Sequence, residues 1–220
     1  SDPRWREGEK EALIELVSKR LPDCTDEKLN ALRAIQSGPI HARTGEQIFE
    51  GVPPGAKFTG FQTDFYLYNW ALGANIDYMK INFSSDYDKY NETLSGELNA
   101  EDENLDAFRD LGGKMIIFSG TEDHRVPYTA TRAYYERVAK RLGSFEKASE
   151  FCLYYIMAGR AHSGGSGIQE LYKLLENLRL WYEKGTEPKL LGISCTENLK
   201  IPVYPYPYTT AADGTPARIY

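Results

Sequence analysis

Apolar positions recur at helical spacing in two stretches near the start of the chain. The first stretch, about residues 8–21, has apolar side chains three or four residues apart: Leu13, Leu16, Val17 and Leu21. The second has a similar apolar face: Leu29, Leu32 and Ile35. This spacing predicts two amphipathic helices. Pro22 ends the first, Thr25 is placed to cap the second, and the Ser-Gly-Pro sequence at 37–39 stops it.

Between about residues 57 and 98 the pattern changes to closely spaced aromatic residues with no single period. Its members are Phe58, Phe61, Phe65, Tyr66, Tyr68, Trp70, Tyr78, Phe83, Tyr87 and Tyr90. We expect short helices and loops here, with aromatic side chains packed against one another.

From about residue 99 onward, compact apolar runs alternate with amphipathic segments. The runs Lys114–Phe118 and Phe151–Met157 predict buried strands, and each is followed by a loop and then a helix closed by Gly143 or Gly185. Strand–helix–strand–helix order with short loops predicts parallel strands. Two strands alone do not make a stable parallel sheet, so we expect the end of a larger one.

The tail differs again, because Pro and Tyr alternate in Ile201–Tyr208. Pro at this density favours extended backbone. We expect a strap laid across the domain surface, and a recognition motif for a partner is the alternative.

Charge and composition argue against several classes of function and site. The 220 residues have a formal net charge of −6 and no basic block, which disfavours nucleic acid as a partner. No apolar run approaches the roughly 18 residues of a membrane span. The three cysteines are Cys24, Cys152 and Cys195, and their wide spacing predicts neither a metal site nor a disulfide framework. Cys152 lies in an apolar run, which predicts a buried thiol.

Two loops that follow the predicted strands hold the candidate chemistry. The first contains Asp123 and His124, and the second contains His162 within a Gly-rich segment about 40 residues after the first. Loops at the carboxyl ends of parallel strands are where open α/β sheets place their sites. Acid and then histidine on consecutive strands is the order of the last two members of an α/β-hydrolase triad. Taken singly, a histidine in a Gly-rich loop such as His162 is more often a turn residue than a catalyst, and Asp123 alone is consistent with a loop cap.

A resemblance extends over most of the chain, in order. The segments that show it are Leu32–Pro39, Gly51–Gly55, Glu103–Asp123, Ala158–Gly165 and Tyr204–Pro207. Together they resemble the tannase/feruloyl esterase family. The resemblance implies the C-terminal part of an α/β-hydrolase sheet with flanking helices, plus a mostly helical or irregular lid segment. It implies a partial lid domain at 1–98, the hydrolase part at 99–190 and a Pro/Tyr-rich strap at 191–220.

By the same resemblance Asp123 is the triad acid and His162 the triad base. We expect no cofactor, and no metal ligands of the family are carried over to this chain. Where the family has a Cys after the histidine this chain has Ser163, and its closing Cys is replaced by Tyr204. No strand–Ser–helix elbow is found, and Ser166 lies four residues from His162 on the same loop, a poor position for a nucleophile. We therefore expect the nucleophilic Ser in an N-terminal part or a second polypeptide, with this chain cut from something longer.

These observations predict a serine ester hydrolase that acts on aromatic-acid esters such as gallates or ferulates. The alternative is a non-catalytic interaction module derived from a hydrolase. A metal-dependent hydrolase is disfavoured, because His124 and His162 lack paired-ligand spacing. From the resemblance we expect a secreted or periplasmic protein. An unpaired sheet edge also predicts a homodimer or another partner.

Overall fold

The chain divides into two compact units. One contains Arg6–Val52 and Thr59–Glu101, and the other contains Asp102–Tyr220. The structure is a computed structural model that describes residues 8–48, 50–52, 65–73, 76–123, 125–162, 168–196 and 199–219. The domain boundaries expected at residues 98 and 190 stay predictions.

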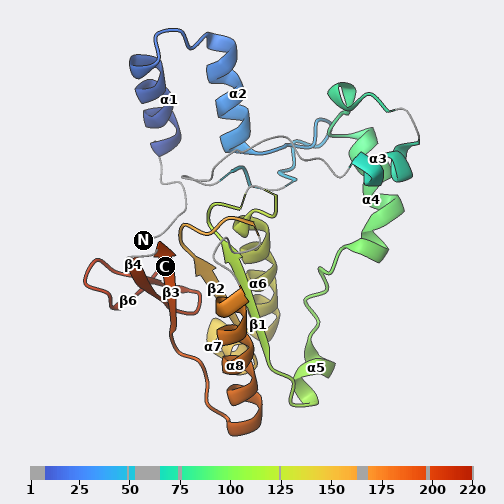
Figure 1. The fold of residues 1–220 in the computed structure, drawn as a ribbon. Coiled ribbons are helices and arrows are strands. Elements are labelled where there is room, and N and C mark those ends of the chain that lie inside the picture. Colours follow the sequence, from blue (N-terminus) through green and yellow to red (C-terminus); the bar gives the residue numbers. More distant parts are fainter. Residues whose placement is uncertain are drawn as a thin grey trace. The chain divides into compact units, whose positions relative to one another are not determined.

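The first unit is helical where the structure describes it (Figure 1). Its elements are α1 (Glu9–Arg20), α2 (Asp26–Ser37), α3 (Phe65–Leu72), the 3₁₀ helix η1 (Tyr78–Lys80) and α4 (Ser85–Leu98). The two predicted N-terminal helices are confirmed, and the Thr25 hydroxyl accepts a hydrogen bond of 3.4 Å from the Lys28 N–H at the start of α2. The aromatic region does form short helices, although Phe58 and Phe61 lie outside the described residues.

The second unit alternates strands and helices, as the apolar pattern predicts. Its elements are α5 (Asp106–Asp110), β1 (Met115–Gly120), α6 (Tyr128–Leu142), α7 (Phe145–Ser149), β2 (Cys152–Met157), α8 (Ile168–Lys184), β3 (Leu191–Thr196), β4 (Leu199–Val203), β5 (Tyr208–Thr210) and β6 (Pro216–Arg218). β1 and β2 pair in parallel, from Met115 opposite Cys152 to Gly120 opposite Met157. The carboxyl ends of both strands therefore meet at one edge of the sheet, and the loops that follow them start side by side.

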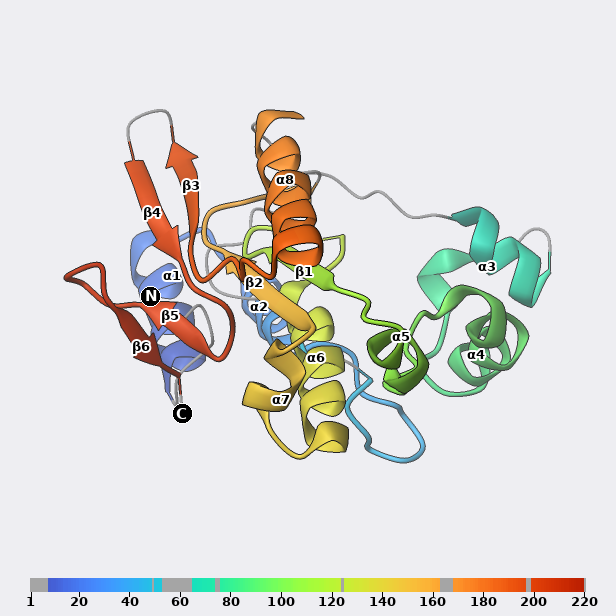
Figure 2. The same ribbon diagram turned by 90° about the horizontal axis from the view of Figure 1, so that it is seen from below.

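Helices cover both faces of this small sheet (Figures 1 and 2), with α8 on one face and α6 and α7 on the other. Side chains along β2 alternate between two cores, because successive residues of a strand point to opposite faces. Leu153, Tyr155 and Met157 pack with Leu174 and Trp181 of α8. On the other face Cys152 and Tyr154 pack with residues of α6 and α7, including Tyr135, Ala139 and Ala148. Burial on both faces explains why this strand is apolar along its whole length.

The C-terminal tail differs from the surface strap expected from its Pro and Tyr residues. Instead of a strap on the surface, it forms two antiparallel hairpins, β3–β4 and β5–β6, and places Tyr206 in the core, where it is 2% exposed. The Tyr206 N–H donates to the Tyr154 carbonyl at 2.7 Å, and its hydroxyl donates to Glu136 Oε1 at 2.5 Å. The ring also contacts Tyr135 and Phe145. A side chain with this many buried partners belongs to the core of the unit.

Candidate active site

Asp123 lies three residues beyond the end of β1, in the loop that leads to α6. Its Oδ1 atom accepts hydrogen bonds from the backbone N–H groups of Arg125, at 2.9 Å, and Val126, at 3.0 Å. Asp is favoured at such turns because its carboxylate satisfies backbone donors two and three residues further on. These bonds fix the carboxylate to its own loop and leave Oδ2 for another partner.

That partner is His162, from the loop after β2. The Nδ1 atom of His162 lies 2.9 Å from Asp123 Oδ2, although the two residues are 39 positions apart in the sequence. Because an ionised carboxylate only accepts hydrogen bonds, Nδ1 must bear the proton and donate it. The lone pair of Nε2 is then free to accept a proton, and no residue in the described part of the chain hydrogen-bonds to it. The structure thus brings together both residues that the sequence predicts as acid and base.

Exposure and charge suit these two roles. The Asp123 side chain is 11% exposed, whereas that of His162 is 39% exposed. Burial has the largest effect on the Asp123 carboxyl and raises its pKa, but the N–H groups of Val126 and Arg125 and the ring of His162 together outweigh it. The net result is a pKa of Asp123 below its ordinary value. The carboxylate therefore stays ionised at neutral pH, where it stabilises a positive charge on His162.

A second His–Asp pair occurs in the helical unit, and the sequence reasoning missed it. His41 Nε2 lies 3.0 Å from Asp88 Oδ1, and the Thr44 N–H donates to His41 Nδ1 at 3.1 Å. Arg43 also donates to Asp88 Oδ2 at 2.8 Å. Since Nδ1 accepts, Nε2 must donate, so both ring nitrogens of the buried His41 are used. No lone pair remains to take a proton from a substrate, and the pair is structural. No local signal predicts it, because the partners are 47 positions apart.

Several candidates of the sequence analysis lie outside the described residues, namely His124, Ser163 and Ser166. Within the described ranges, no group of three or more His, Cys, Asp or Glu side chains is arranged to hold a metal ion.

Cys152 is buried as predicted, and burial raises the pKa of its thiol to about 12. No helix in the described part of the chain is long and apolar enough to cross a membrane.

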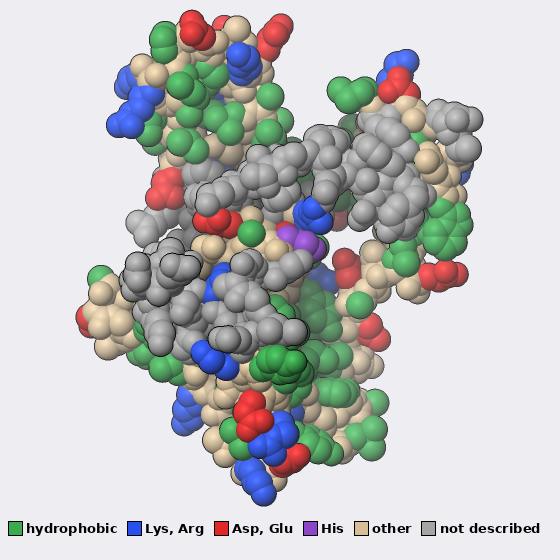
Figure 3. Space-filling view, viewed as in Figure 1, with side chains coloured by type: hydrophobic (Ala, Val, Ile, Leu, Met, Phe, Trp, Pro, Cys, Tyr) green, Lys and Arg blue, Asp and Glu red, His purple; other side chains and the backbone are tan. Residues whose placement is uncertain are grey.

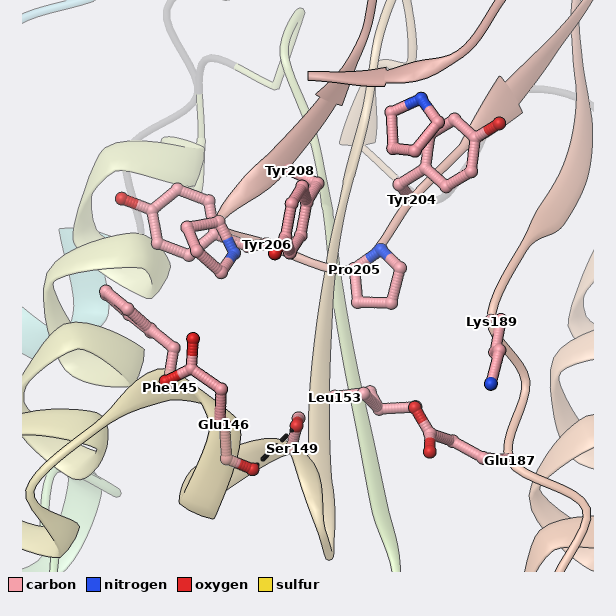
Figure 4. Close-up of a pocket in the computed structure, with 12 residues that line it drawn as sticks. Phe145, Glu146, Ser149, Leu153, Glu187, Lys189, Tyr204, Pro205, Tyr206 and Tyr208 are labelled. Atoms are coloured by element: carbon pink, nitrogen blue, oxygen red, sulfur yellow. Dashed lines mark hydrogen bonds between the residues drawn. The ribbon is translucent and has the colours of Figure 1, made fainter. Parts of the chain in front are cut away.

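Among the described side chains that Figure 3 colours, basic and acidic ones are interspersed within each unit. A cavity of about 380 Å³ lies elsewhere in the second unit, between α7 and the tail. Figure 4 shows its lining: Tyr and Pro rings of residues 204–208, Phe145, Leu153, and the charged side chains of Glu187 and Lys189. Neither Asp123 nor His162 lines this cavity, so it is separate from the candidate active site.

Comparison with known proteins identifies relatives of this chain. An uncharacterised esterase of Xanthomonas campestris pv. campestris is 25% identical over an alignment of 219 residues that covers 75% of this chain and 38% of the relative. Feruloyl esterase C of Talaromyces stipitatus is 27% identical over 168 residues, covering 70% of this chain and 31% of the relative. The chain thus spans less than two fifths of the length of either relative.

Among solved structures, feruloyl esterase B of Aspergillus oryzae matches with a TM-score of 0.71 at 18% identity, covering 84% of this chain and 42% of that one. The match confirms the predicted fold class, the partial α/β-hydrolase sheet with flanking helices. The family model described as tannase and feruloyl esterase matches residues 66–215. Because that match spans well over half of the sequence, this chain belongs to the tannase and feruloyl esterase family.

Proposed function

We propose that this chain supplies the acid and the base of a serine ester hydrolase, with Asp123 as the acid and His162 as the base. The hydrogen bond of 2.9 Å between His162 Nδ1 and Asp123 Oδ2 supports this proposal most directly. Family membership supports ester hydrolysis as the reaction class. The substrate, an aromatic-acid ester, is proposed from the same relationship.

In this mechanism His162 Nε2 removes the proton of a serine hydroxyl as the serine oxygen attacks the ester carbonyl. Asp123 holds the ring in the required tautomer and stabilises the imidazolium that forms. The imidazolium then gives its proton to the departing alcohol, which leaves an acyl-serine. Water attacks the acyl-serine with His162 again as the base, and the free acid and the serine are restored.

The nucleophilic serine is proposed to lie outside this chain, in an N-terminal part or a second polypeptide. The chain covers 38% and 31% of the two relatives above, so most of their length has no counterpart here. We assign the first, helical unit to a lid domain from the family alone; its aromatic side chains pack within that unit or, as the alternative, stack on the acid ring of the substrate. Export from the cell is proposed from the family alone; its test is detection of the protein in periplasmic or culture fractions.

The test is His162→Ala in the full-length protein that contains this chain, assayed with methyl ferulate and methyl gallate. We expect kcat to fall by at least about 10³-fold while the protein stays folded as judged by circular dichroism, because the side chain is partly exposed and its removal leaves no buried cavity. The matched control is His41→Ala. It removes a buried pair, so it lowers the melting temperature while the folded fraction keeps its kcat. Full activity of His162→Ala would rule out the proposed role.

A non-catalytic interaction module remains the second candidate, because Ser163 stands where the family has a Cys. Labelling with a serine-reactive fluorophosphonate, followed by intact mass measurement of every polypeptide present, separates the two. Label on a serine outside this chain supports the enzyme. Label within this chain would move the nucleophile to it, and a complete absence of label supports the interaction module.

A further inference from the structure

The two loops that present Asp123 and His162 are joined directly to each other beyond the ends of their strands. The Thr121 N–H donates to the Met157 carbonyl at 3.1 Å, and the Glu122 N–H donates to the Arg160 carbonyl at 2.9 Å. In the opposite direction, the Gly159 N–H donates to the Thr121 hydroxyl at 2.9 Å. These three hydrogen bonds continue the contact between the two segments beyond the ends of β1 and β2.

At the last residue of β1, the histidine loop comes so close that there is no room for a side chain. A Cβ atom added at Gly120 would lie 2.1 Å from the Arg160 carbonyl oxygen. The next residue, Thr121, is 7% exposed, and its hydroxyl accepts the hydrogen bond from the Gly159 N–H. Of the three hydrogen bonds that join the loops, two are between backbone groups and the third uses the Thr121 hydroxyl.

The register between the loops determines where His162 lies relative to Asp123. Asp123 is bound to its own loop through Arg125 and Val126, and it follows Thr121 by two residues. Gly159 precedes His162 by three residues, and the bond to Asp123 is the hydrogen bond that the structure describes for the His162 ring. A shift between the loops is therefore transmitted to the 2.9 Å contact on which proton transfer depends.

We infer that Thr121 is a positioning residue for the histidine, a role that rests on the proposed function. Its hydroxyl holds the start of the histidine loop against the acid loop and so keeps His162 Nδ1 within hydrogen-bonding distance of Asp123. Thr121 does not touch the substrate in this role. It acts on turnover through the orientation of the ring, and a displacement of about 1 Å in such a site lowers a rate by about 10²-fold.

The test compares Thr121→Val with Thr121→Ser in the full-length protein. Valine keeps the shape and removes the hydroxyl, whereas serine keeps the hydroxyl. We expect Thr121→Val to lower kcat by about 10- to 100-fold with KM within about twofold of the wild type. Thr121→Ser should keep kcat within about threefold. Should Thr121→Val fail to fold, as judged by circular dichroism, the smaller Thr121→Ala takes its place with the same expected result.

Thr129 offers a matched control in the same unit. It is buried to the same degree, at 5% exposed, and its hydroxyl has no hydrogen-bond partner in the described part of the chain. Thr129→Val should leave kcat and KM unchanged. Equal kcat values for Thr121→Val and Thr129→Val, or equal losses for Thr121→Val and Thr121→Ser, would overturn the assignment.

A second readout does not depend on turnover. The proton shared by His162 and Asp123 should give a low-field signal in the ¹H NMR spectrum of the wild type that is absent from His162→Ala. We expect Thr121→Ser to retain this signal and Thr121→Val to lose or broaden it. An unchanged signal in Thr121→Val, with activity lost in His162→Ala, would reject the role of Thr121 and leave the proposed function intact. Full activity of His162→Ala would reject the proposed function itself.

Discussion

At the scale of single residues, His41 and His162 each have an aspartate oxygen within 3.0 Å of a ring nitrogen. Their surroundings give them different capacities. The backbone N–H of Thr44 occupies the second nitrogen of His41, and the ring is buried. His162 keeps its second nitrogen unused within the described residues and is partly exposed. A histidine next to an aspartate is therefore a candidate base only when its other nitrogen can still accept a proton.

The lowered pKa of Asp123 predicts how stability responds to acid. A carboxyl whose pKa is lower in the folded than in the unfolded state stabilises the fold above its unfolded pKa of about 3.9, and this contribution is lost as the pH falls through the folded pKa. Asp123→Asn removes the charge at every pH. The melting temperature of the wild type should therefore exceed that of Asp123→Asn at pH 6–7, and the difference should shrink below about pH 4. A difference that does not change with pH would contradict the lowered pKa.

At the scale of elements, the sequence predicts the segments whose partners are close in the chain or whose burial is complete. The apolar runs predict both strands of the sheet. Burial on two faces explains the run in Cys152–Met157, whereas β1 is at most half-buried and its Phe118 is 46% exposed, so the expected burial of that strand is wrong. The hairpins of the tail were not predicted, since Tyr206 is held by Tyr154 and Glu136, which are distant in sequence. Asp123 and His162 are predicted as acid and base because each follows a strand; the structure brings them together, and their catalytic role stays a prediction. Thr121 was missed because its function depends on a backbone group of the other loop.

The junction of β1 with the histidine loop gives a prediction at this scale. In Gly120→Ala the new Cβ would lie 2.1 Å from the Arg160 carbonyl oxygen, which belongs to backbone and cannot move aside cheaply. We expect this variant to lower the free energy of unfolding by about 1–3 kcal/mol. Gly96→Ala is the control, because Gly96 lies within α4 and has nothing within 4 Å of an added Cβ. Alanine should stabilise that helix by roughly 0.5–1 kcal/mol. Denaturant unfolding measures both, and equal effects would contradict the close approach.

At the scale of the whole molecule, the second unit contains both catalytic candidates, on the loops that follow the two parallel strands β1 and β2. Within the described residues, β1 pairs with β2 on one side and has no strand on its other side. Hydrophobic side chains gather over β1, α5 and α8 on the face shown in Figure 3. Phe118 of β1 and Leu171 and Leu175 of α8 are exposed apolar side chains of this unit. An unpaired strand edge flanked by apolar side chains is a surface on which further chain can pair.

We therefore predict that this chain, expressed alone, self-associates through the β1 side of the sheet. Phe118 is 46% exposed on that strand, and a charge there should weaken strand-to-strand association. Phe118→Lys should accordingly shift the mass measured by light scattering toward the 25.0 kDa monomer. Met79→Lys is the matched control, because Met79 is 90% exposed in the other unit and its replacement adds the same charge away from the sheet. A monodisperse wild-type monomer would contradict the prediction. Equal effects of the two substitutions would mean that added charge, and not the edge of β1, governs the association.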